Sequence, residues 1–250
     1  MSQSSIPDAI QEDLLRLGVR PGGLLLVHSS MKSLGHVPGG PEMVIRGLLA
    51  GIGSEGTLLM PALSYEHVTY AYPVFDLVNT PSNVGLVAET FRKRIGTLRS
   101  LHPTHSICAY GSRADELIRD HGLDSTPCGE HSPLSRLPES GGQVLMLGCG
   151  LEPNTSMHAV EELVEPEYLY DSPQDYRLIL ANGRRSIRRY RPHNFRGWSQ
   201  RYDRLADVMP AGLRCGKVLQ AECFLIEAQI MWEKTLERLR ENPLYFVDQV

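Results

Sequence analysis

The chain has 250 residues, a formal net charge of −4 and a pI of about 6.1, and this length can bury a large core as one α/β domain or as two closely packed halves. Its apolar fraction of 42% and charged fraction of 22% are ordinary for a soluble globular enzyme. The mildly acidic balance argues against nucleic acid as a partner, because such binding usually requires a basic patch. No apolar run approaches a membrane-spanning length, and the N-terminus lacks the order of a signal peptide, so we expect no membrane association.

The five cysteines show neither disulfide nor zinc-ribbon spacing. This usage predicts reduced thiols in a cytoplasmic protein.

The pattern of apolar and polar residues up to residue 61 predicts two helices and two buried strands. An amphipathic helix over residues 5–17 is followed by short continuous apolar runs at 24–27 and 57–61, which are typical of buried strands. Between the strands, the polar segment 28–40 precedes a helix that begins at Pro41. Such a loop presents free N–H groups and hydroxyls to an anionic or amide-rich ligand. Neither a Walker sequence nor a dinucleotide fingerprint occurs.

The middle of the chain alternates polar loops with predicted helices and strands. Residues 62–82 form a long irregular loop with aromatic and acidic side chains, which favours either a substrate wall or a packed surface loop. Helices are expected over 83–94 and 112–121, and strands over 107–111 and 143–147.

Two histidines, His102 and His105, precede the strand at 107–111 with a spacing that suggests a metal ion. No further histidine or cysteine pair at ligand spacing supports such a site, so we expect no metal.

A short helix is predicted over residues 154–162, directly after the strand at 143–147. Helical spacing places His158, Glu161 and Glu162 on one face. A histidine beside a carboxylate at a strand end is typical of a general base, but also of a solvated surface pair.

The last third of the chain predicts a hairpin, two helices and a strand. Asn182-Gly183 between alternating segments indicates a hairpin over residues 176–191. Its basic cluster at 184–189 is consistent with a solvated strand face or with phosphate binding. Helices are expected over 196–209 and 228–240, with a strand over 216–226. Together these elements predict a mixed central sheet covered by helices.

Several short motifs, in this order and spacing, resemble the aminoglycoside 3-N-acetyltransferase family, whose antibiotic N-acetyltransferase fold differs from the Gcn5-like fold. The resemblance extends from Leu15 to Glu233. It is carried by Val27-His28-Ser29-Ser30, Gly56-Thr57-Leu58-x-Met60-Pro61, Arg99-Ser100-x-His102-Pro103-x-x-Ser106, Gly129-Glu130-x-Ser132-Pro133 and Asn154-x-Ser156-x-His158-x-x-Glu161.

The resemblance implies that residues 1–250 form a single acetyltransferase domain, which transfers an acetyl group from acetyl-CoA to a primary amine of an aminoglycoside or a related small molecule. It implies His158 as the general base, with Glu161 one turn later. The implied coenzyme-facing residues are Ser29, Ser30, Ser33, Leu34, Gly35, His102 and Ser106. The residues expected to face the substrate are Tyr65, Glu66, Asp76, Glu130 and Glu162.

This chain departs from the family pattern after the histidine, where an acidic residue is expected and His193 occurs. We therefore include His193 with His158 and Glu161 as a catalytic residue.

The substrate-facing loops are also less acidic than a polycationic aminoglycoside favours, so a biosynthetic amine is a second candidate acceptor. Two further functions stay open at this point, a non-catalytic coenzyme-binding protein and a metal-dependent hydrolase that uses His102, His105 and His158. The apolar residues 244–247 are expected to pack on the core or on a second copy in a homodimer.

Overall fold

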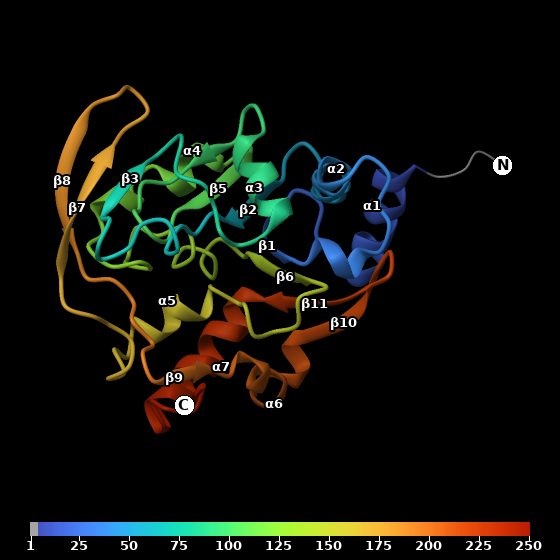
Figure 1. The fold of residues 1–250 in the computed structure, drawn as a ribbon. Helices are drawn as coiled ribbons and strands as arrows, with labels where there is room; N and C mark the ends of the chain where they lie inside the picture. The colour runs from blue at the N-terminus through green and yellow to red at the C-terminus, as the bar shows by residue number, and fades with distance from the viewer. Residues whose placement is uncertain (1–4) are drawn as a thin grey trace.

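The computed structural model describes residues 5–250, and a seven-stranded mixed sheet forms its centre (Figure 1). Its strands are β1 (Leu24–Ser29), β2 (Thr57–Pro61), β4 (Leu98–Arg99), β5 (Ile107–Gly111), β6 (Gln143–Leu147), β10 (Leu213–Val218) and β11 (Ala221–Glu227). They are ordered β10-β11-β6-β1-β2-β5-β4. β1 runs parallel to both neighbours, β2 and β6, and the other pairings in this sheet are antiparallel.

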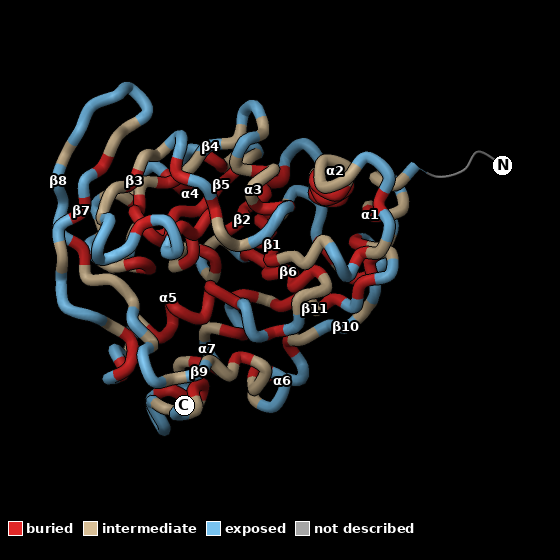
Figure 2. The backbone as a smooth tube through the Cα atoms, viewed as in Figure 1, coloured by how far each residue is buried: buried red, intermediate tan, exposed pale blue. Residues whose placement is uncertain are grey.

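Helices cover both faces of this sheet. One face packs against α1 (Ile6–Leu17), α2 (Pro41–Ile52) and α3 (Leu86–Lys93). The other packs against α4 (Ala114–Ile118), α5 (Met157–Glu161) and α7 (Ala228–Glu241). Because strand side chains alternate, Leu25 and Val27 enter the first core cluster whereas Leu24 and Leu26 enter the second. This double covering explains the continuous apolar runs, because β1, β2 and β6 at the centre of the sheet are buried almost throughout (Figure 2).

The hairpin predicted around Asn182-Gly183 is confirmed as β7 (Gln174–Ile179) and β8 (Arg185–Tyr190), and it projects from one side of the molecule (Figure 1). The segment 62–82 is not wholly irregular, because β3 (Val74–Asp76) pairs in parallel with β7. Phe75 is fully buried and packs in the same small cluster as residues of the hairpin, which explains why this stretch is extended.

The predicted helix over residues 196–209 is wrong. β9 (Trp198–Gln200) pairs instead with β12 (Val247–Gln249), and only the short 3-10 helix η3 (Tyr202–Arg204) and the four-residue helix α6 (Leu205–Val208) follow. Phe195 and Gly197 have positive φ angles of 51° and 82°, which a right-handed helix does not allow. The C-terminal strand thus folds back on the chain, and Phe246 is fully buried in the core.

The predicted strand over residues 216–226 is also wrong as a single element. It is a hairpin, β10 and β11, which turns at Leu219 with φ 52° and Gln220. No glycine marks this turn, so the sequence pattern does not reveal it. The helices predicted over 83–94, 112–121 and 154–162 are shorter than expected, as α3, α4 and α5. The short turns η1 (Met31–Leu34), η2 (His121–Leu123) and η4 (Pro210–Gly212) complete the elements.

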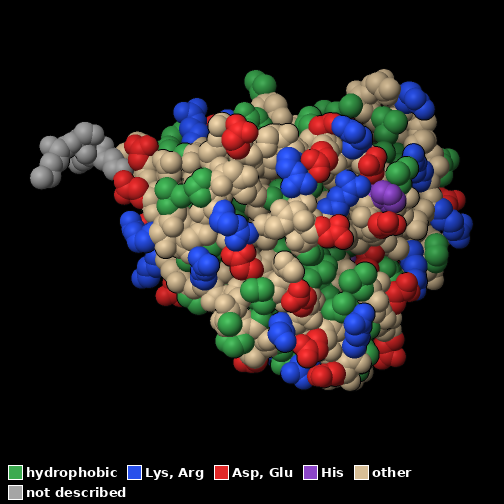
Figure 3. Space-filling view, turned by 180° about the vertical axis from the view of Figure 1, so that it is seen from behind, with side chains coloured by type: hydrophobic (Ala, Val, Ile, Leu, Met, Phe, Trp, Pro, Cys, Tyr) green, Lys and Arg blue, Asp and Glu red, His purple; other side chains and the backbone are tan. Residues whose placement is uncertain are grey.

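The surface seen from behind intersperses acidic and basic side chains (Figure 3). Among residues 5–250, no helix has the length and apolar character needed to cross a bilayer. All five cysteines are free.

Candidate active site

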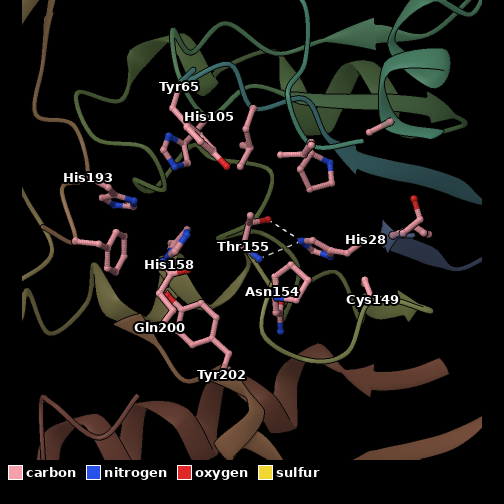
Figure 4. A pocket seen from close by; sticks show the side chains of 18 of the residues that line it. His28, Tyr65, His105, Cys149, Asn154, Thr155, His158, His193, Gln200 and Tyr202 are labelled. Carbon is pink, nitrogen blue, oxygen red and sulfur yellow. Dashed lines mark hydrogen bonds between the residues drawn. The ribbon is translucent and has the colours of Figure 1, made fainter. Parts of the chain in front are cut away.

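A cavity of about 460 Å³ lies at the edge of the central sheet where β1, β2 and β6 end (Figure 4). β5 runs antiparallel to β2 and pairs Ile107 with Pro61, so the segment that precedes β5 reaches the same edge and brings His105 to the cavity. The carboxyl ends of parallel strands are the usual ligand sites of open α/β sheets.

The helix α5 places His158 at this cavity. Met157, Ala159 and Val160 pack in the core beneath the sheet, which fixes the orientation of this short helix. Its opposite side then carries His158, which is 5% exposed and lines the cavity, and Glu161, which is fully buried.

The Glu161 carboxylate accepts three hydrogen bonds. Tyr168 Oη donates to Oε1 at 2.8 Å, while Tyr202 Oη and His158 Nδ1 donate to Oε2 at 2.8 and 3.0 Å. Because a carboxylate only accepts hydrogen bonds, Nδ1 of His158 carries a proton. When this ring is neutral, its lone pair is therefore on Nε2, and Nε2 is then the nitrogen that can accept a proton.

A second pair lies beside the first. Nε2 of His193 lies 2.8 Å from Oε1 of Glu162, and the same carboxylate accepts hydrogen bonds from the Thr126 hydroxyl at 2.6 Å and the Cys128 backbone N–H at 2.7 Å. Burial raises the pKa of Glu162, and these hydrogen bonds oppose the rise. His193 therefore contacts Glu162 rather than completing the pair of His158 and Glu161.

The other histidines near the cavity are held neutral. Burial lowers the pKa of His193 and of His105 well below the ordinary value, and the neighbouring histidines add to the effect. Burial also lowers the pKa of His28 to about 3. Nε2 of His28 accepts the Thr155 backbone N–H at 3.0 Å and lies 2.8 Å from the Thr155 hydroxyl (Figure 4). Since a backbone N–H can only donate, the proton of His28 is on Nδ1.

Residues 26–240 match the family model for aminoglycoside 3-N-acetyltransferase. The chain belongs to the aminoglycoside 3-N-acetyltransferase family. It is therefore an acyltransferase, and the expected resemblance is confirmed.

Curated relatives and solved structures agree with this family. Aminoglycoside N(3)-acetyltransferase IX of Micromonospora chalcea is 31% identical over 255 residues and covers 88% of each chain. Aminoglycoside N(3)-acetyltransferase VII of Streptomyces paromomycinus is 32% identical over 254 residues, covering 88% of this chain and 86% of that relative.

Among solved structures, a histidine-to-alanine mutant of the aminoglycoside acetyltransferase AAC(3)-IVa in complex with a gentamicin has a TM-score of 0.83 and 30% identity, covering 98% of this chain and 92% of its own. The binary structure of AAC-IIIb with CoASH has a TM-score of 0.82 and 26% identity, covering 95% and 97%. The predicted fold, distinct from the Gcn5-like one, is thus confirmed.

In this acetyltransferase, four residues predicted for the site line the cavity: Ser29, Tyr65, His158 and His193. Glu161 and Glu162 lie directly behind the two histidines.

The remaining residues expected to face the coenzyme do not line the cavity. Ser33 donates its hydroxyl to the Gly148 carbonyl, and this hydrogen bond connects the turn after β1 to the end of β6. Ser30 and Gly35 flank the same turn. Leu34 is buried in the core.

His102 and Ser106 are fully buried, and both stabilise the loop before β5. Nδ1 of His102 accepts the His105 backbone N–H at 3.0 Å. The Ser106 hydroxyl donates to the Ala62 carbonyl and accepts from Arg99.

Three acids expected to face the substrate lie outside the cavity lining. Glu66 and Glu130 are exposed on loops. Asp76 on β3 accepts the backbone N–H groups of Val78 and Asn79 and so stabilises its own turn.

The sequence does not single out Tyr168, Tyr202 and Thr155 as site residues, and it suggests His105 only as a metal ligand. The tyrosines approach Glu161 only through tertiary folding, so no local spacing announces them. For His28, the one signal in the sequence is its position at a strand end, next to Ser29.

Proposed function

We propose that this protein is an acetyl-CoA-dependent N-acetyltransferase that acetylates a primary amine of an aminoglycoside, with His158 as general base and residues 1–250 as a single catalytic domain. The supporting observation is the pairing of His158 with the buried Glu161, which leaves Nε2 as the acceptor at the cavity. Strands from both ends of the chain enter the central sheet, which supports the single domain.

The base is needed because an alkylammonium has a pKa near 10.4, so at pH 7 almost none of it has a free lone pair. Nε2 of His158 accepts the ammonium proton, and the amine nitrogen forms a bond to the thioester carbonyl carbon while the carbonyl electrons move to oxygen. Collapse of this intermediate breaks the carbon–sulfur bond, the nitrogen loses its second proton, and the thiolate takes the proton from His158. One amide, one free thiol and one released proton result. Such a base supplies about 10²–10⁴-fold in rate.

His28 is the proposed donor to the acetyl oxygen. Its Nδ1 is buried and has no hydrogen-bond partner within residues 5–250, yet its ring lines the cavity. An unpaired buried N–H is costly, and a bound carbonyl that becomes an oxyanion would satisfy it. Ser29 and the turn that follows β1 are proposed to hold the coenzyme, as expected from the sequence. The bound CoASH of AAC-IIIb supports acetyl-CoA as the donor.

The decisive experiment compares wild-type protein with His158→Asn, using His67→Asn, an exposed histidine, as the matched control. Thiol release from acetyl-CoA with gentamicin, apramycin and sisomicin should fall about 10²–10⁴-fold in His158→Asn. Coenzyme A binding, measured by calorimetry, should persist. Unchanged turnover in His158→Asn would contradict the base assignment.

One observation favours a less charged acceptor as the second candidate. Of the residues in 5–250 that line the cavity, none is an aspartate or a glutamate, although a polycation is usually held by carboxylates. An amine of a biosynthetic intermediate, which carries less positive charge, fits a cavity lined in this way. Turnover of simple primary amines with none on the aminoglycosides would favour this candidate, and coenzyme binding without any turnover would indicate a non-catalytic protein.

A further inference from the structure

Three histidine rings meet at the cavity from three separate segments of the chain (Figure 4). One nitrogen each from His105, His158 and His193 lies within 4.8 Å of the others. The ring centroids of His158 and His193 are 5.1 Å apart, as are those of His105 and His193. The cluster combines the end of the loop before β5, α5 and the segment before β9.

Each of these rings is oriented by a partner on its other nitrogen. Thr104 contacts Nδ1 of His105 at 2.8 Å, Glu161 holds Nδ1 of His158, and Glu162 holds Nε2 of His193. This leaves Nε2 of His105, Nε2 of His158 and Nδ1 of His193. The last is buried and without a hydrogen-bond partner among residues 5–250.

This arrangement offers three nitrogen ligands to a transition-metal ion. Histidines that bind zinc almost always donate their second N–H to a carboxylate, carbonyl or other acceptor, and here two of the three have a carboxylate there. Three histidines with one open position form a common zinc coordination. Nitrogens bound to a tetrahedral Zn²⁺ at about 2.0–2.1 Å lie about 3.4 Å apart, so ring movements of about 1 Å would close the site.

We propose that His105, His158 and His193 bind a divalent transition-metal ion, with Zn²⁺ as the fitting ion, and that the bound ion inhibits acetyl transfer. The ion takes the lone pair of His158 Nε2, so this nitrogen no longer accepts a proton. The metal is thus an inhibitor and not a cofactor. Metal binding is independent of the proposed function, whereas inhibition depends on it.

Metal binding is tested on protein without a histidine tag, by competition between the protein and a chromogenic zinc chelator. Wild-type protein should bind one Zn²⁺ per chain, and Co²⁺ should give the visible absorption of a four- or five-coordinate ion. His105→Asn and His193→Asn should each weaken binding at least tenfold. Glu162→Gln should weaken it about 10–100-fold, because it removes the partner that orients His193.

Two controls exclude other ligands. His67→Asn removes an exposed histidine and Cys215→Ser removes the exposed thiol, and both should leave the affinity unchanged. Melting temperatures measured without metal show whether each variant folds. Absence of zinc binding by the wild type, or equal binding by the folded double variant H105N/H193N, would overturn the proposal.

Inhibition is then measured by mass spectrometry of the acetylated product, because Zn²⁺ also binds the thiol that the reaction releases. Added Zn²⁺ should inhibit at concentrations that match its Kd, and a chelator should restore the rate. Binding of zinc without loss of rate would overturn the inhibitory role. Zinc binding by a protein that shows no turnover in metal-free buffer would instead contradict only the proposed function.

Discussion

Tyr202 donates its hydroxyl to Glu161 at 2.8 Å and so connects the segment after β9 to the helix that carries His158. The same hydroxyl lies 2.9 Å from Nδ1 of His158. Burial and the nearby Glu161 carboxylate raise the pKa of Tyr202 well above its ordinary value, which keeps the phenol protonated as a donor. Hydrogen bonds to both oxygens of Glu161 therefore fix its carboxylate, and the fixed carboxylate keeps the proton of His158 on Nδ1.

Replacing Glu161 by Gln should lower kcat about 10²–10⁴-fold, because the amide neither holds the proton on Nδ1 nor stabilises the imidazolium that forms when Nε2 accepts a proton. KM for acetyl-CoA should change little. Steady-state kinetics over a range of pH checks this, with Glu66→Gln, an exposed carboxylate, as the control. A kcat equal to that of the wild type in a folded Glu161→Gln protein would contradict the role of Glu161.

Replacing Tyr202 by Phe should have a smaller effect, about tenfold on kcat. It removes one of three hydrogen bonds to Glu161 while the charge and the bond from Tyr168 remain, and a single hydrogen bond contributes about 0.5–1.5 kcal/mol. Tyr168→Phe is the matched variant, since it removes the bond to the oxygen that does not contact His158. A larger loss in Tyr168→Phe than in Tyr202→Phe would mean that the contact with His158 is unimportant.

Replacing His28 by Phe should lower kcat about 10²–10³-fold with little change in KM for the amine, as expected for the loss of one donor to an oxyanion. Thr155→Val should cost less, because the Thr155 backbone N–H still donates to Nε2 and keeps the proton on Nδ1. Single-turnover rates and melting temperatures of both variants separate chemistry from folding. Equal kcat in wild type and His28→Phe would exclude His28 as the oxyanion donor.

The sequence predicts correctly those elements whose signal lies in the residues of the element itself. Apolar runs such as residues 143–147 are buried on both faces and need no knowledge of their neighbours, and His158 and Glu161 meet through helical spacing alone. The spacing of Trp198, Tyr202 and Leu205 gave the wrong helix because pairing with the C-terminal strand decides the backbone there. Tertiary folding overrides propensity at this position.

The same limit applies to the site. The spacing of His102 and His105 suggests two metal ligands, but only His105 reaches the cluster, where it meets His158 and the distant His193. His102 faces the interior, where its ring stacks on His121 with centroids 5.2 Å apart. Spacing in the chain cannot distinguish these two histidines, because the turn between them sends their rings in different directions.

The buried histidines predict an acid-sensitive fold. Burial lowers the pKa of His121 to about 4 and of His28 to about 3, and it lowers the pKa of His102 well below the ordinary value of 6.5. In the unfolded chain, each of these histidines binds a proton as the pH falls below about 6.5, whereas in the folded protein it stays neutral down to its lowered pKa. Its contribution to the free energy of unfolding is therefore complete above pH 6.5 and is lost as the pH falls toward the folded pKa.

We therefore expect the free energy of unfolding, from urea titrations, to decrease between pH 7.5 and pH 5, with each such histidine costing on the order of 1–2 kcal/mol by pH 5. Carboxylates with lowered pKa values, such as Glu89 at about 2, change the free energy of unfolding only below about pH 4.5, which is outside this window. Glu162, whose pKa burial raises, acts in the opposite direction and reduces the total. A free energy of unfolding that is constant from pH 7.5 to pH 5 would mean that these rings are protonated inside the folded protein.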